Sequence, residues 1–150
     1  GAKYNIYKIL DFAPVEGSTT QGRYTVVNEW ADFLAGAGAA YLKANDLENA
    51  KKYLEMYKNI EGVAGEIINA LVYSLRGDLA VEQNDLAAAV ELFRQAMTAS
   101  NDPISYTDNA QKLALVYEAM GDKAKAQKIY KDAVTKYPEL AIALGKYIME

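Results

Sequence analysis

The chain has 150 residues and a formal net charge of −4, from 16 Lys and Arg against 20 Asp and Glu. It contains no histidine and no cysteine, which excludes Ser-His-Asp and Cys-His catalysis, thiol redox chemistry and zinc sites built from these residues. We therefore expect no catalytic residue, no metal site and no cofactor, and the acidic balance argues against nucleic acid as a partner.

The first 24 residues differ from the rest of the chain. Tyr4–Phe12 favours a short helix with several apolar side chains, and Ala13–Arg23 has the Pro, Gly, Ser and Thr content of a loop. We interpret residues 1–30 as an N-terminal flap or partial repeat. Trp30, the single tryptophan, is expected to precede the first repeat helix and to hold the flap.

The compartment depends on what precedes the chain in its gene. The sequence starts with Gly1-Ala2, without methionine, which is typical of a processed end or a tag remnant. No run of about 18 apolar residues occurs, so we expect no membrane span within this sequence. An upstream apolar segment would make the protein periplasmic and membrane-anchored; otherwise we expect it in the cytoplasm.

From Thr25 onward the sequence predicts helices almost throughout. Helix-favouring residues are abundant, and apolar residues recur every three or four positions. Breaks are predicted at Asn45-Asp46, Glu61-Gly62, Asn84-Asp85, Ser100–Pro103, Gly121-Asp122 and Tyr137-Pro138. These breaks imply helices of roughly 12–20 residues joined by short turns, and hence an all-α fold.

One spacing of residues occurs three times along the chain. An Asn-Asp or Gly-Asp turn is followed by an alanine four residues after the Asp and by a large apolar residue four further on. The turns end in Asp46, Asp85 and Asp122, the alanines are Ala50, Ala89 and Ala126, and the large residues are Leu54, Phe93 and Tyr130. Small residues also precede the turns, at Gly38, Gly77 and Ala114. The small residues let two helices approach closely, the large residue fills the groove against the neighbouring hairpin, and the Asp caps the second helix.

This pattern resembles the tetratricopeptide repeat family over residues 31–138. The third copy matches best, with Leu113, Ala114, Tyr117, Gly121, Asp122, Ala126, Tyr130, Ala133 and Pro138. The second copy departs at Ala80, where the family prefers an aromatic residue, and the first at Tyr57, where it prefers a small one. The resemblance implies one domain over residues 1–150, a right-handed α-solenoid of about three helical hairpins with residues 139–150 as an amphipathic capping helix.

The spacing of the copies is longer than the 34 residues usual for the family. Gly38 and Gly77 are 39 residues apart, and Gly77 and Ala114 are 37 apart. The extra residues fall in the turns between hairpins. Longer turns of this kind resemble the bacterial envelope-associated members of the family.

The resemblance also implies a binding surface, because the first helix of each hairpin lines the concave face in this family. The residues that carry over to that face, as candidate partner-binding positions, are Leu42, Lys43, Leu71, Ser74, Asp78, Val81, Glu82, Gln111, Leu115 and Glu118. With Asp32 and Asp108 added, the face has five carboxylates and one basic residue, Lys43. Capture of an acidic peptide tail would be unfavourable. We expect a scaffold for a partner protein that offers an extended or helical segment with a few apolar anchors and basic flanks.

Two alternatives stay open beside this function. The apolar residues of the first helices can pack on a neighbouring hairpin or on the N-terminal flap, which would fill the groove from within the chain. The protein can also be a structural subunit that self-assembles through its repeats, as a homo-oligomer. Gly36–Ala40 has no P-loop Lys-Ser/Thr and follows no strand, so we interpret its small residues as helix packing and not as a phosphate loop.

Overall fold

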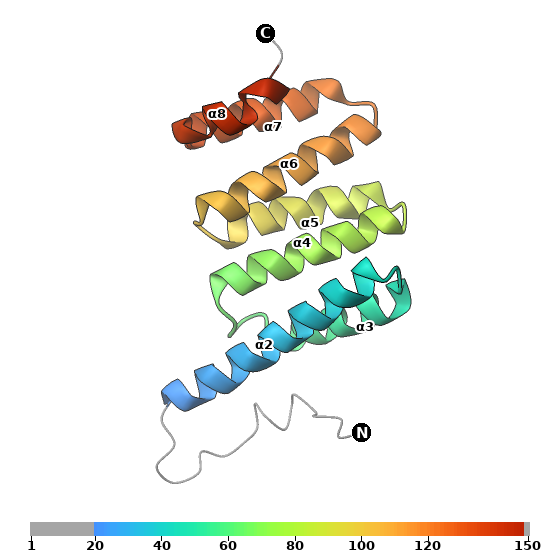
Figure 1. Ribbon diagram of the computed structural model, residues 1–150, viewed down its shortest axis with the longest axis vertical. Helices are drawn as coiled ribbons and strands as arrows, with labels where there is room; N and C mark the ends of the chain where they lie inside the picture. Colours follow the sequence, from blue (N-terminus) through green and yellow to red (C-terminus); the bar gives the residue numbers. More distant parts are fainter. Residues whose placement is uncertain (1–19, 149–150) are drawn as a thin grey trace.

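The computed structural model describes the backbone of residues 20–148 and the side chains of residues 26–148. In this range, helices α2 to α7 form three antiparallel pairs that stack on one another (Figure 1). The pairs are α2 (Thr20–Lys43) with α3 (Leu47–Met56), α4 (Glu66–Glu82) with α5 (Leu86–Ala99), and α6 (Pro103–Ala119) with α7 (Lys123–Lys136). The described residues contain no strand, and none of their helices is long and apolar enough to cross a membrane. The fold is an all-α helical repeat solenoid.

The turns within the pairs have the conformation that the sequence predicts. Asn45 and Asn84 have φ of 58° and Gly121 has φ of 83°, so each adopts the left-handed conformation that ends a helix. The Asp that follows accepts a hydrogen bond from a backbone N–H three residues later, as N-cap of the second helix. The backbone N–H of the same Asp also bonds the carbonyl five residues earlier, at Tyr41, Ala80 or Tyr117, over 2.8 Å.

Close contact between the helices of each pair is also confirmed. Ala50, Ala89 and Ala126 are completely buried. A methyl group added at Gly77 would lie 2.7 Å from Cδ1 of Phe93, and one added at Gly38 would lie 2.8 Å from Cγ of Leu54. The large residue therefore lies on the glycine of its own pair, and the prediction that it fills the groove against the neighbouring hairpin is wrong.

Two clusters of buried side chains form the core. One joins the first pair to α4 through residues such as Leu34, Leu54 and Val72, and the other joins the second and third pairs through residues such as Phe93 and Leu113. Because α4 contributes to both clusters, the three pairs form one continuous stack.

Hydrogen bonds of two polar side chains, Tyr57 and Asn69, order the first turn between pairs. The one-turn 3-10 helix η1 (Tyr57–Asn59) follows α3, and the hydroxyl of Tyr57 donates a hydrogen bond to Oδ1 of Asn69 over 2.6 Å. Nδ2 of Asn69 donates to the backbone oxygen of Glu61 over 3.1 Å. Burial raises the pKa of the Tyr57 hydroxyl, and the nearby Glu61 carboxylate adds to the effect. The large residue at position 57 thus helps to order the longer turn.

Two expectations about the N-terminal end of the array are wrong. Helix α2 begins at Thr20, so residues 20–23 are helical and not part of a loop, and Trp30 lies inside this helix and not before it. Val27 and Leu34 of α2 are buried in the core, which stabilises this part of the helix. The helix extends back to Thr20 because adding turns to a formed helix costs little free energy. The expected helix at Tyr4–Phe12 lies outside the described residues.

The expected capping helix at residues 139–150 is not one continuous helix. The chain forms η2 (Pro138–Leu140), α8 (Ala141–Leu144) and η3 (Gly145–Tyr147) in succession. Gly145 disfavours continuation of an α-helix because it loses the most conformational freedom. These turns still cover α7: Leu144 is buried, and the ring of Tyr147 stacks on Tyr130 with centroids 5.3 Å apart.

Gly77→Ala tests the close contact within a pair. The added methyl group would push the buried Phe93 ring, and overpacking of this kind costs about 1–3 kcal/mol. We expect a lower free energy of unfolding in urea, followed by circular dichroism. Gly36→Ala is the matched control, because it also lies in a helix but nothing lies within 4 Å of its added methyl group. Better helix propensity should make that variant more stable by up to about 1 kcal/mol. Equal effects of the two substitutions would contradict the packing account.

Candidate functional site

A hollow between α4 and α6 is the clearest candidate for a binding site, and we call it the α4/α6 groove. It encloses about 450 Å³. Its lining residues are Ile67, Leu71 and Ser74 of α4, the cap residue Asp102, and Ile104, Ser105, Asp108, Asn109, Gln111, Lys112 and Leu115 of α6. Both helices are the first of their pairs, as expected for the binding surface of the repeats.

Four exposed large apolar side chains line the groove. Ile104 is 71% exposed and Leu115 is 54% exposed, and on the opposite side Ile67 and Leu71 are also exposed. Large apolar side chains that gather on a surface mark sites of protein contact more often than single exposed ones do. Four such side chains around one hollow therefore favour a binding function.

Lys112 links the two walls of the groove. Its ammonium group lies 2.9 Å from Oδ2 of Asp78 and donates a hydrogen bond over 3.0 Å to Oγ of Ser74, both on α4. The same ammonium lies 5.9 Å from the ring centroid of the buried Phe93, within cation–π range. Ser74 is buried at the lining of the groove, and its hydroxyl accepts the hydrogen bond from Lys112. Lys112 thus bridges α4 and α6.

The charge of the groove is mainly acidic. Asp102 caps α6 by accepting a hydrogen bond from the backbone N–H of Ser105 over 2.9 Å, and Asp108 lies about 1.7 turns further along the helix. The lining thus contains two carboxylates, Asp102 and Asp108, and the one lysine, Lys112, is paired with a third carboxylate, Asp78. A ligand with positive charge near the groove would gain favourable electrostatic contact, more so at low ionic strength.

The structure brings together about half of the residues expected at the binding surface. Leu71, Ser74, Gln111 and Leu115 line the groove, and Asp78 is joined to it through Lys112. The remaining expected residues do not line it; they lie near the C-terminal ends of α2, α4 and α6 and are Leu42, Lys43, Val81, Glu82 and Glu118. The groove occupies the N-terminal halves of α4 and α6.

Six lining residues of the groove are not among the positions that the sequence predicts: Ile67, Asp102, Ile104, Ser105, Asn109 and Lys112. Ile67 and Ile104 are 37 residues apart, as are Gly77 and Ala114, so extending the repeat alignment by one turn would have found them. Lys112 follows Asp108 by four residues and therefore shares its helix face. The expectation that Lys43 is the one basic residue of this surface is wrong, because Lys112 belongs to it.

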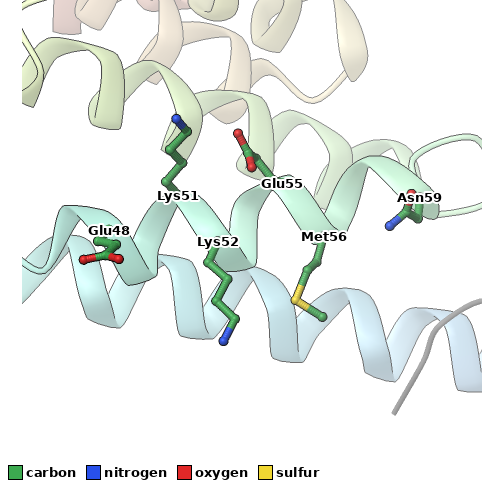
Figure 2. A pocket seen from close by; sticks show the side chains of 6 residues that line it. All are labelled: Glu48, Lys51, Lys52, Glu55, Met56 and Asn59. Atoms are coloured by element: carbon green, nitrogen blue, oxygen red, sulfur yellow. The ribbon is translucent and has the colours of Figure 1, made fainter. Parts of the chain in front are cut away.

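A second hollow lies on the outside of the first pair (Figure 2). It is lined by Glu48, Lys51, Lys52, Glu55, Met56 and Asn59. All six residues come from α3 and η1, with Lys51 and Glu55 pointing to one side of the helix and Lys52 and Met56 to the other. Mixed charges on a single helix are typical of a solvated outer face. We therefore do not assign a binding role to this hollow.

The displaced pKa values of the described residues have a structural cause. Burial raises the pKa of the Tyr106 and Tyr130 hydroxyls, with smaller contributions from neighbouring carboxylates, and burial lowers the pKa of the Arg76 guanidinium. These groups lie in or beside the core and not in the lining of the groove. The described residues also contain no group of three acidic side chains that could hold a metal ion.

The arrangement of stacked helix pairs with a groove along their first helices defines a helical repeat protein. Comparison with known families specifies the repeat: two models described as tetratricopeptide repeat match residues 70–103 and 109–139. The matches cover most of the second and third helix pairs and support the tetratricopeptide repeat family for this chain. No curated protein and no solved structure matched it. Repeats of this family generally mediate protein–protein interactions, and the proteins that contain them are typically non-catalytic scaffolds.

Lys112→Met tests the link between the walls of the groove. The variant keeps most of the aliphatic chain but loses the hydrogen bonds to Ser74 and Asp78. Because the lysine side chain is 38% exposed, we expect the free energy of unfolding to fall by no more than about 1 kcal/mol. Lys128→Met is the control, since its pair with Asp132 is more exposed and should contribute about 0.3–0.5 kcal/mol. A larger loss for Lys128→Met, measured by thermal unfolding, would contradict the assignment.

Proposed function

We propose that the protein is a non-catalytic interaction scaffold that receives an apolar segment of a partner protein in the α4/α6 groove. The observation that carries this proposal is the gathering of exposed Ile67, Leu71, Ile104 and Leu115 around one hollow. Apolar anchors supply most of the free energy when a helix or an extended peptide binds in a groove. Tetratricopeptide repeats generally bind proteins, which supports the same role.

The chemistry of the groove selects the kind of segment. Its two apolar walls suit one or two Leu- or Ile-sized anchors, while Asp102 and Asp108 favour Lys or Arg beside those anchors. Lys112 is engaged by Asp78, so the groove offers no free cation cluster to a carboxylate. The proposed ligand is therefore a segment with apolar anchors and basic flanks. The more distant Val81, Glu82, Glu118, Leu42 and Lys43 would contact only a longer segment that continues past the groove.

A separate proposal concerns the compartment: we propose that the scaffold acts in the bacterial envelope. The resemblance to envelope-associated members rests on the two longer turns between pairs, of which the first is held by Tyr57 and Asn69. The two family matches support the repeat and do not distinguish this subtype.

A pair of synthetic peptides tests the proposed ligand chemistry. Both carry the same two leucines at helical spacing, one with lysines and the other with glutamates as flanks. We expect the fluorescence anisotropy of the labelled lysine peptide to report binding at least about tenfold tighter than that of the glutamate peptide, which corresponds to about 1.4 kcal/mol. The difference should shrink at high salt because the charges are exposed.

Variants locate the binding site in the same assay. Leu71→Asp and Leu115→Asp place a carboxylate among the anchors and should abolish binding, while the exposed side chains leave the fold intact by circular dichroism. Ile142→Asp is the matched control, because Ile142 is 96% exposed and lies on α8, away from the groove. Unchanged peptide binding by both groove variants would contradict the proposal. Light scattering would reveal the competing role, self-assembly, as a mass that rises with protein concentration.

A further inference from the structure

Helix α2 carries a second apolar stripe besides the one that packs in the core. Val26, Trp30, Phe33, Ala37 and Tyr41 recur at intervals of three or four residues and so share one side of the helix. Helices α3 and α4 pack on another side, where Val27, Ala31, Leu34 and Ala35 are buried. Figure 1 shows α2 and α3 at one end of the stack. The stripe therefore lies on the end of the array.

Aromatic rings make this stripe continuous with α3. The rings of Trp30 and Phe33 stack with centroids 5.4 Å apart, Phe33 meets Tyr53 edge to face at 6.1 Å, and Tyr53 stacks on Tyr41 at 5.4 Å. Met56 points to the same side of α3 as Lys52, toward α2 (Figure 2). We call Val26, Trp30, Phe33, Tyr41 and Tyr53 the end face. Phe33 remains 53% exposed.

The residues at the same repeat positions in the second and third pairs show what covers this side of the first helix there. Residues 39 and 76 positions after Phe33 are Val72 and Asn109, which are 1% and 3% exposed. Val72 belongs to the cluster formed with the preceding pair, and Tyr117, which corresponds to Tyr41, accepts a hydrogen bond from Arg94 of the preceding α5. In the second and third pairs, this side of the first helix is thus buried against the second helix of the pair before it. In the first pair the same side is aromatic and has no described helix before it.

The chain itself contains a segment suited to this position. We propose that residues Tyr4–Phe12 pack on the end face and take the place of the second helix of a preceding pair. Six of these nine residues are apolar: Tyr4, Ile6, Tyr7, Ile9, Leu10 and Phe12. They precede α2 in the chain as α3 precedes α4 and α5 precedes α6. This role is independent of what binds in the α4/α6 groove.

Chain length favours this occupant over a second copy of the protein. Residues 13–19 can span up to about 23 Å when extended, and the helix from Thr20 to Phe33 rises about 20 Å. The segment can therefore turn back and reach the middle of the end face. A tether this short holds it at a local concentration in the millimolar range. A second copy at micromolar concentration would also have to lose its translational freedom.

Cross-linking of the full chain tests the proposal without interference, because the sequence has no cysteine. One variant carries Leu10→Cys with Phe33→Cys on the end face, and the other carries Leu10→Cys with Leu115→Cys in the groove. Phe33 and Leu115 are matched in exposure, at 53% and 54%. Under mild oxidation at micromolar protein, we expect the end-face pair to form an intramolecular disulfide at least about tenfold faster, as proximity requires. Mass spectrometry of the monomer band gives the rate.

Three outcomes would overturn the proposal. Equal rates would mean that the segment has no preferred place, and faster closure with Leu115→Cys would place it in the groove. Disulfide-linked dimers through Phe33→Cys would assign the end face to a second copy.

The fluorescence of Trp30 gives an independent readout that needs no cross-link. Leu10→Asp should release the segment, shift the emission of Trp30 to the red and increase its quenching by acrylamide. Lys8→Asp is the control for an added carboxylate in the same segment, and it should have the smaller effect. Unchanged emission in Leu10→Asp, with the fold intact by circular dichroism, would contradict packing on the end face.

Discussion

The structure depends on the close approach of the two helices in each pair. Gly38 and Gly77 leave no room for a β-carbon, because Leu54 and Phe93 occupy that space. The contact brings buried Ala50 and Ala89 into the interface and fixes how the first helix of each pair lies against the second. Each pair then presents its first helix to the next pair in the same way. The stack, the groove and the end face all follow from this repeated contact.

A stack of similar helix pairs leaves apolar surface exposed in two places, the α4/α6 groove and the end face. Between α4 and α6, Lys112 links the two first helices, and Ile104 and Leu115 remain exposed beside the link. At the end of the array, the side of α2 that a preceding pair would cover carries Phe33 and Trp30 instead. The first surface suits a segment of another protein, and the second suits a segment of the same chain. Because they lie on different sides of the first helices, the two can be occupied at the same time.

Local features were the easiest to predict. The left-handed Asn45, Asn84 and Gly121 and the capping aspartates depend on neighbours within a few residues, so the sequence pattern was sufficient. The end of the chain was harder: the amphipathic pattern after Pro138 predicts one helix, but the chain forms three short turns that fit around Tyr130. There Gly145 interrupts the helix, and the ring of Tyr147 stacks on Tyr130 of α7.

The sequence by itself determined that the chain forms paired helices with close internal contacts, because small residues and turns at fixed intervals permit little else. It also determined the absence of histidine and cysteine chemistry. Only the tertiary structure decided which exposed residues form a site. Ile67 and Ile104 are 37 residues apart in sequence, and Lys112 is 34 residues from Asp78, so their meeting depends on how two pairs stack. The repeat alignment can place these residues on one face of their helices, but how closely the two faces approach results from many side chains packing together.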